Sequence, residues 1–124
     1  MKLVILGDAV NPHIQRWVSY FIKRKFNIHI ISFQACDNDY ANVHYVRPPK
    51  FLFISQVTPF WRKVGYIFCI LKVRKLILSL SPDIIHAHWA SSYGFNAAIS
   101  GFHPFIVSTW GSEITDSPKK SWIM

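Results

Sequence analysis

Two histidines, His86 and His88, are the first candidates for chemistry in this sequence. They end a short apolar run, and residues two apart on a strand point to the same face. Imidazole exchanges protons near neutral pH, which suits catalysis at the end of a strand. A buried, hydrogen-bonded side chain is the alternative for either ring. An HxH pair can also ligate zinc, but neither cysteine is near in sequence to complete a site, so we expect no metal.

A second group of candidates consists of aromatic and polar residues, which stand directly after His88 and again at positions 110–113. An indole offers a flat apolar face of the kind that stacks on sugar rings, although tryptophan more often fills a core. A glycine allows close backbone approach, and exposed N–H groups beside it bind an anion or a hydroxyl. We therefore predict a substrate-binding surface formed by Trp89, Ser91, Trp110, Gly111, Ser112 and Glu113.

A third group lies where the first helix is expected to begin. Asn11 is a good N-cap, and Pro12 suits the first helical position. Helix N-termini attract anions, and an arginine one turn in would add a charge-assisted contact. There is no GxGxxG motif, so a dinucleotide fingerprint is absent. We predict substrate contacts from Asp8, Asn11, His13 and Arg16; the alternative is that Asn11 only caps the helix and His13 is solvated.

Apolar runs and helical stripes predict the elements that must position these groups. Strands are expected over 2–6, 28–33, 42–46, 83–88 and 104–109, and helices over 12–25, 60–80 and 91–100. The first helix carries a core-facing stripe of Ile14, Trp17, Val18, Phe21 and Ile22. This order predicts an α/β fold with a doubly wound, mostly parallel Rossmann-like sheet.

Right-handed crossovers give this sheet the strand order 3-2-1-4-5. Ligands of such sheets bind at the carboxyl ends of the strands, where the strand order reverses. Here that point lies between the strands at 2–6 and 83–88. The loops 7–12, 88–92 and 110–114 would meet there, which brings the three groups of candidate residues into one crevice.

The sheet is expected to be incomplete at its C-terminal end. After Glu113 only eleven residues remain, with no helix to cover the last strand. We therefore divide the chain into a partial Rossmann-like domain over 1–114 and the tail of a truncated chain over 115–124.

Composition and charge narrow the class of protein. With 51% hydrophobic residues the chain is not disordered, and a formal net charge of +8 favours anionic partners. The two cysteines form no CxxC motif, which indicates reduced thiols. Neither a signal peptide nor an apolar run of about eighteen residues is present, so we expect a cytoplasmic protein.

Residues 51–80 combine aromatic, aliphatic and basic side chains. This mixture suits a helix that lies in a membrane interface. The alternative is a core-packed helix whose basic ends reach solvent. No nucleic-acid motif accompanies the region, so no nucleic-acid partner is expected. The predicted contacts with an anionic membrane surface are Trp61, Arg62, Lys63, Lys72, Arg74 and Lys75.

Three segments resemble the N-terminal half of family 4 glycosyltransferases of the GT-B type: GDAVNPHIQRWV (7–18), PDIIHAHWASSYGFNAAISG (82–101) and PFIVSTWGSEI (104–114). The resemblance implies the acceptor side of a two-domain enzyme whose C-terminal domain grips a nucleotide-sugar. It also implies retention of anomeric configuration, no cofactor beyond the nucleotide-sugar co-substrate, no bound metal, and a frequent location on the inner membrane face. Members often carry histidine where this chain has Trp110.

We therefore expect the acceptor-binding half of a retaining glycosyltransferase of the hexosyltransferase type, silent without its donor domain. Its partners would be a sugar or lipid-linked acceptor in polysaccharide biosynthesis, the missing C-terminal donor domain and an anionic membrane surface. The alternative is a non-catalytic α/β module that docks on a membrane or binds a phosphorylated ligand.

Overall fold

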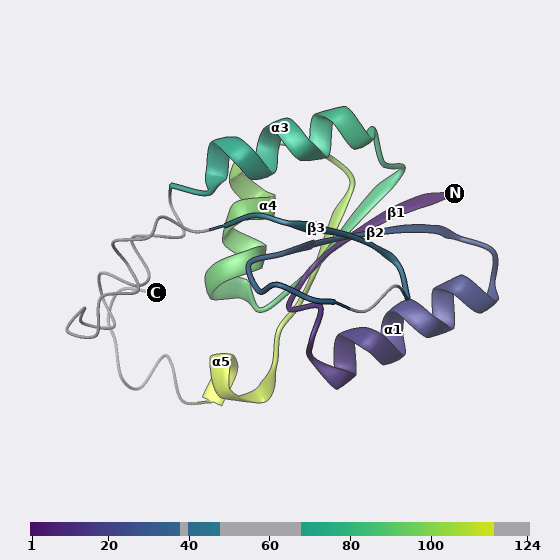
Figure 1. The fold of residues 1–124 in the computed structure, drawn as a ribbon. Helices are drawn as coiled ribbons and strands as arrows, with labels where there is room; N and C mark the ends of the chain where they lie inside the picture. The colour runs from purple at the N-terminus through teal and green to yellow at the C-terminus, as the bar shows by residue number, and fades with distance from the viewer. Residues whose placement is uncertain (38–39, 48–67, 116–124) are drawn as a thin grey trace.

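The computed structural model describes residues 1–37, 40–47 and 68–115, which form a five-stranded parallel sheet (Figure 1). The strands are β1 (Lys2–Leu6), β2 (Asn27–Ser32), β3 (Asn42–Tyr45), β4 (Ile84–His88) and β5 (Phe105–Ser108). Their order is β3-β2-β1-β4-β5. The predicted Rossmann-like α/β class and the predicted strand order are both confirmed.

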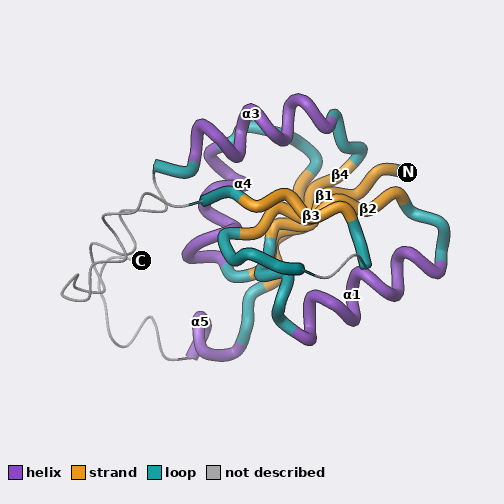
Figure 2. The backbone as a smooth tube through the Cα atoms, in the orientation of Figure 1, coloured by secondary structure: helices purple, strands orange, loops and turns teal. Residues whose placement is uncertain are grey.

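Helices cover both faces of the sheet, as Figure 2 shows. One face is covered by α1 (Pro12–Lys23), and the other by α3 (Ile70–Leu80) and α4 (Phe95–Ile99). Alternate strand residues supply the two cores: Leu3 and Ile5 pack with α1, whereas Val4 and Leu6 lie in the cluster that includes α3 and α4. Both faces of the central strands are thus buried, which explains their continuous apolar sequence.

The start of α1 agrees with its sequence signals. The side-chain oxygen of Asn11 accepts a hydrogen bond from the His13 backbone N–H at 2.9 Å, which confirms the N-cap. Ile14 and Val18 are fully buried, but Trp17 and Ile22 remain 40% and 42% exposed. The prediction that all five stripe residues face the core is therefore wrong for these two, because both project sideways from the line through Ile14 and Val18.

The bounds of all three predicted helices differ from the prediction, and α1 ends at Lys23, two residues earlier than expected. α3 begins at Ile70, after a turn at residues 68–69, and residues 60–67 lie outside the described part of the chain. The sequence carries no capping residue there, so nothing in it marked the start. The helix expected over 91–100 opens with a π-helical turn, η2 (Ala90–Gly94), before α4. Gly101 has a φ of 71°, which confirms its place just beyond the end of the helix.

The segment after β5 is not the loop that the sequence predicted. A short helix, α5 (Gly111–Thr115), begins at Gly111, and the Thr115 hydroxyl donates to the Gly111 carbonyl at 2.7 Å. A residue bonding back four positions in this way is compatible with a helical turn. On β5, Ile106 and Val107 are still 51% and 36% exposed. Residues 116–124 are outside the described part, so the division at residue 114 stays a prediction.

Within residues 1–37, 40–47 and 68–115, no helix is long and apolar enough to cross a bilayer.

Candidate functional site

The two histidines of β4 lie side by side at the carboxyl end of the strand. His88 is completely buried and His86 is 6% exposed, and their ring centroids are 4.3 Å apart. His86 pairs with Ile5 of β1 in the sheet register. Because Ile5 faces α1, both imidazoles lie on the α1 side of the sheet, beside the point where the strand order reverses.

Aromatic rings from α1, from the segment after β5 and from Trp89, which follows His88 directly, surround this pair. The Trp17 ring of α1 meets His86 edge-on with centroids 5.2 Å apart. Trp110 lies just after β5, and its ring centroid is 6.0 Å from that of His88 and 5.7 Å from that of Trp89. The contact between Trp89 and Trp110 brings loops 88–92 and 110–114 together as predicted. The start of α1, just after loop 7–12, joins them through the His13 and Trp110 rings, whose centroids are 4.8 Å apart. The set is called the aromatic–histidine cluster, and it comprises His13, Trp17, His86, His88, Trp89 and Trp110.

His86 is held in place by a hydroxyl on the neighbouring strand. Its Nε2 atom and the Ser108 Oγ atom share a hydrogen bond of 2.7 Å. Burial lowers the pKa of His86, so the ring is held neutral at neutral pH. The hydrogen bond fixes the orientation of the ring. Sequence reasoning missed Ser108, although its place at the end of β5, beside β4, was a signal that could have found it.

His88 has no such anchor. Neither of its ring nitrogens has a hydrogen-bond partner among the described residues. Burial, together with the neighbouring His86, lowers the pKa of His88 to about 4, so the ring is neutral at pH 7. A buried polar group without a partner costs about 1–3 kcal/mol. His88 therefore offers one N–H donor and one lone pair to any molecule that reaches the cluster.

The backbone at the end of β4 is strained where it enters the cluster. Trp89 has a φ of 65°, in the left-handed region that residues with a side chain rarely adopt. Its carbonyl accepts a hydrogen bond from Gly94 N–H at 2.8 Å, and its own N–H donates to the Ser108 carbonyl at 3.1 Å. A Cβ on Gly94 would lie 3.2 Å from the Trp89 carbonyl oxygen. Strain held by its surroundings in this way is typical of functional sites.

A comparison with known protein families identifies the family of the chain. The family model described as glycosyl transferase 4-like matches residues 2–124. The chain belongs to the glycosyl transferase 4-like family. The resemblance inferred from the three sequence segments is thereby confirmed. A search among curated proteins finds no match to this sequence.

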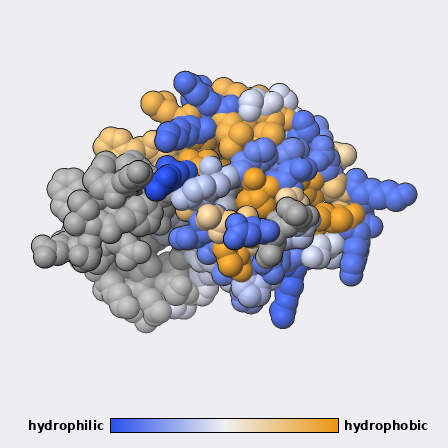
Figure 3. Space-filling model, in the orientation of Figure 1, coloured by the Kyte–Doolittle hydropathy of each residue, from blue (hydrophilic) through white to orange (hydrophobic). Residues whose placement is uncertain are grey.

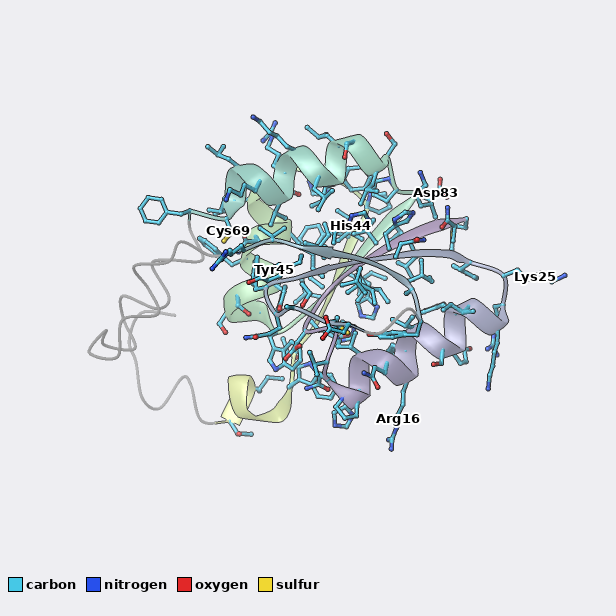
Figure 4. The ribbon with its side chains drawn as sticks, in the orientation of Figure 1. Arg16, Lys25, His44, Tyr45, Cys69 and Asp83 are labelled. Carbon is cyan, nitrogen blue, oxygen red and sulfur yellow. The ribbon has the colours of Figure 1, made fainter. Side chains whose placement is uncertain are left out.

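In this glycosyl transferase 4-like chain, the residues at the start of α1 divide into three kinds. Asp8 accepts a hydrogen bond from the Val10 N–H at 3.0 Å and Asn11 caps the helix, so both shape the turn. His13 joins the cluster through Trp110. Arg16 does not: it is exposed and points away from the sheet in Figure 4. In this structure Arg16 is therefore not directed toward the cluster, where a charge-assisted contact with a ligand would form.

The other predicted residues of this glycosyl transferase 4-like chain lie around or away from the cluster. Ser91 is exposed in η2, and Gly111 begins α5 in a place where an added Cβ would meet no described atom within 4 Å. The side chains of Ser112 and Glu113, and all of residues 61–63, lie outside the described part. Lys72, Arg74 and Lys75 are exposed on α3. No group of three His, Cys, Asp or Glu side chains within the described ranges is placed to hold a metal ion.

Trp17 was assigned to the core from sequence and is now a member of the cluster. The stripe rule counts positions but does not say which of them lie at the rim of the buried face. The hint was its spacing: Trp17 stands four residues after His13, so both project from the same side of the helix.

Proposed function

We propose that the aromatic–histidine cluster binds the acceptor in glycosyl transfer, and that the chain is the acceptor-binding half of a retaining glycosyltransferase. Family membership supports a glycosyltransferase-related role. The single observation that supports this use of the cluster is the buried, unpartnered imidazole of His88 beneath Trp110 and beside Trp17.

A sugar hydroxyl complements this arrangement because it both donates and accepts a hydrogen bond. The neutral His88 ring presents one donor and one acceptor, which a single water or sugar hydroxyl can meet. The indole faces of Trp89 and Trp110 supply apolar surface for the C–H side of a sugar ring. The side chains of the cluster therefore complement a neutral polar ring with one apolar face.

The low pKa of His88 limits what the ring does in the reaction. With a pKa of about 4, the imidazole is a weak proton acceptor at pH 7. Its role in the proposal is to orient the acceptor hydroxyl with its lone pair. His86 is the second ring of the pair. Burial keeps it neutral, and the hydrogen bond to Ser108 holds it in place. Removing either ring should therefore affect acceptor positioning before it affects proton transfer.

In the proposal, the nucleotide-sugar donor does not bind at the aromatic–histidine cluster. We assign nucleotide-sugar binding to a C-terminal donor domain, so the nucleotide-sugar is a co-substrate and no further cofactor or metal is needed. Two observations support this: the sequence has no GxGxxG motif, and Arg16 points away from the cluster (Figure 4). The 124-residue chain should bind acceptors and transfer nothing.

Calorimetry on the 124-residue chain tests this assignment. The probes are methyl glycosides of glucose, galactose, mannose and N-acetylglucosamine, with UDP-glucose and UDP-galactose as donors. We expect saturable heat with at least one methyl glycoside, none with the donors, and no transfer product from any pair. His88→Leu should abolish the heat, and His44→Leu, on the other face of the sheet, should leave it unchanged.

Three results would overturn the proposal. These are donor binding that exceeds glycoside binding, transfer by the chain alone, and glycoside binding that His88→Leu leaves intact. Circular dichroism spectra of both variants confirm that each is folded before it is titrated.

A further inference from the structure

Exposed rings continue from the aromatic–histidine cluster along one side of α1. His13, Trp17 and Tyr20 are spaced i, i+4 and i+7, so they form one line along the helix. His13 and Trp17 belong to the cluster, whereas Tyr20 lies on the next turn and is 47% exposed. The line spans about 10 Å, since each residue of a helix rises by about 1.5 Å. The three rings, called the aromatic line, therefore extend beyond the space that one sugar ring would fill.

The ring of Tyr20 is held in place although it is exposed. The guanidinium of Arg24 lies over this ring, 3.6 Å from its centroid, and an Nη1–H of Arg24 donates to the Tyr20 carbonyl at 3.4 Å. The Phe21 ring meets the Tyr20 ring edge-on, with centroids 5.3 Å apart. A side chain that is already ordered loses less conformational entropy when a ligand binds. Tyr20 therefore offers a preorganised aromatic surface to solvent.

Positive charge and hydrogen-bonding groups lie next to Tyr20. An open groove of about 470 Å³ on the outer side of α1, called the α1 groove, is lined by Pro12, Gln15, Arg16, Ser19, Tyr20 and Lys23. The sequence of α1 (PHIQRWVSYFIK) contains no acidic residue that would neutralise Arg16 and Lys23 within the helix. In Figure 3, hydrophilic side chains project from the lower right of the molecule, where Figure 1 places α1. The α1 groove therefore combines two cations with polar side chains and one aromatic ring.

We propose that the aromatic line and the α1 groove bind an oligosaccharide in which acidic sugars follow a neutral end. The neutral end occupies the aromatic–histidine cluster, a following sugar stacks on Tyr20, and the carboxylates of the acidic sugars contact Arg16 and Lys23. The inference rests on the proposed function and names the class of acceptor, which is an acidic oligosaccharide.

The mixture of side chains decides between this class and other ligands. Aromatic faces supply apolar surface for the C–H sides of successive sugar rings, and Arg16 and Lys23 make charge-assisted hydrogen bonds with carboxylates. A small inorganic anion would match the charges but would leave Tyr20 uncovered. A neutral oligosaccharide would cover Tyr20 but would leave both cations without a partner. An acidic oligosaccharide satisfies the ring and the charges together.

Calorimetry on the 124-residue chain tests the proposal. The acidic probes are the unsulfated tetrasaccharides of hyaluronan, heparosan and chondroitin, in which an N-acetylhexosamine alternates with glucuronic acid. The neutral probes are the same tetrasaccharides with their carboxylates reduced to alcohols. We expect at least one acidic tetrasaccharide to bind at least about tenfold more tightly than its reduced form and than any methyl glycoside. This difference should shrink in about 1 M salt, where the Debye length falls to about 3 Å.

Two variants locate the contacts. Tyr20→Ala should weaken binding of the acidic tetrasaccharide about fivefold, because one stacking surface is lost. Arg16→Gln with Lys23→Gln should lower its affinity to that of the reduced form. Neither change should alter the affinity for methyl glycosides, since these residues lie outside the aromatic–histidine cluster.

Matched controls lie elsewhere on the molecule. Tyr45→Ala removes a tyrosine that is also 47% exposed, on the edge strand β3. Lys72→Gln with Lys75→Gln removes two exposed cations from α3, on the other face of the sheet. Both controls should bind the acidic tetrasaccharide like the parent chain. Circular dichroism spectra confirm that every variant is folded.

The outcomes separate this inference from the proposed function. Methyl glycosides that bind as tightly as the acidic tetrasaccharides would overturn the inference and leave the acceptor site in place. Reduced tetrasaccharides that match the acidic ones would overturn the acidic class, as would equal losses in the α3 control. Binding of neither methyl glycosides nor tetrasaccharides would overturn both proposals. A hexaglutamate peptide that binds more tightly than every tetrasaccharide would assign the α1 groove to an acidic peptide instead.

Discussion

Two pairs of histidines lie on opposite faces of the same sheet, and their surroundings differ. His29 of β2 and His44 of β3 lie on the α3 side, where His44 is labelled in Figure 4; His86 and His88 of β4 lie on the α1 side. Both pairs bring two imidazoles into contact. In the first pair, His29 Nδ1 and His44 Nε2 share a hydrogen bond of 3.0 Å. In the second pair, Ser108 bonds His86 and nothing among the described residues bonds His88.

The first pair satisfies itself. Each ring supplies the partner that the other needs, and the bond joins the edge strand β3 to β2. Burial lowers the pKa of both rings, and the nearby His44 and Lys2 charges lower that of His29 further, so both stay neutral at pH 7. We infer that this pair is structural.

The difference shows that spacing alone does not identify a functional histidine. An unmet donor and acceptor in a buried ring, surrounded by aromatic side chains from other segments, is what separates His88 from His44. The two pairs should therefore respond differently to acid, to substitution and to ligand. The expected effects are given from the largest to the smallest.

Acid should destabilise the fold chiefly through His88. Its pKa is about 4 in the folded chain and about 6.5 when unfolded, so the unfolded chain binds a proton that the folded chain does not. The contribution of this ring to stability is full well above pH 6.5, and it falls by roughly 2–3 kcal/mol as the pH drops toward 4. Urea unfolding at pH 7.5 and 4.5 measures the loss. His88→Leu should remove more of it than His44→Leu; the reverse order would contradict the comparison.

His88→Leu should separate binding from stability at pH 7.5. Replacing an unpartnered buried ring by an apolar side chain of similar size removes unmet polar groups, so the free energy of unfolding should stay within about 1 kcal/mol or rise. Glycoside affinity should fall at least about tenfold, or about 1.4 kcal/mol. Urea unfolding and calorimetry on one preparation check both. A large loss of stability with unchanged affinity would assign His88 to the core.

His44→Leu should have the opposite profile. It leaves the His29 ring without its partner, which should cost about 1 kcal/mol because His29 is only partly buried. Glycoside binding should not change, since the pair lies across the sheet from the cluster. A loss of affinity with full stability would show that the two pairs are coupled and that the comparison is wrong.

Ser108→Ala should have the smallest effect. Removing the hydroxyl takes away one hydrogen bond to His86, worth about 0.5–1.5 kcal/mol, while the ring stays packed against Trp17. Affinity should fall a few-fold, and less than in His88→Leu. Ser19→Ala, on the exposed side of α1, is the matched control. If Ser108→Ala equals or exceeds His88→Leu, the orientation of His86, and not the unmet ring of His88, controls binding.

Much of the frame could be predicted from the sequence. Buried parallel strands have continuous apolar sequences, and the handedness of crossovers then leaves few strand orders, so the meeting of His13, His88 and Trp110 followed from topology. The cap at Asn11 is a local interaction between neighbours and was equally accessible.

The chemistry of the cluster was harder to predict, because it depends on contacts between distant segments. Ser108 bonds His86 while His88 has no partner among the described residues, and the side-chain positions across β4 and β5 that decide this leave no trace in the sequence. The exposed position of Trp17 depends on how α1 rolls on the sheet. The periodicity of the sequence predicts which residues of α1 form the apolar stripe, but not how the helix is rotated about its axis on the sheet. The composition does not indicate which buried polar groups find a hydrogen-bond partner.

Nitrogen NMR of the histidine rings tests the central claim most directly. The free chain is labelled with ¹⁵N-histidine. The unprotonated nitrogen of His88 should have the chemical shift of an imidazole nitrogen that accepts no hydrogen bond, unlike the bonded nitrogens of His29 and His44. Adding a methyl glycoside that binds should move the His88 resonance saturably and leave the other pair unchanged. A His88 nitrogen that is already hydrogen-bonded in the free chain, or that does not move while the glycoside binds, would contradict the account.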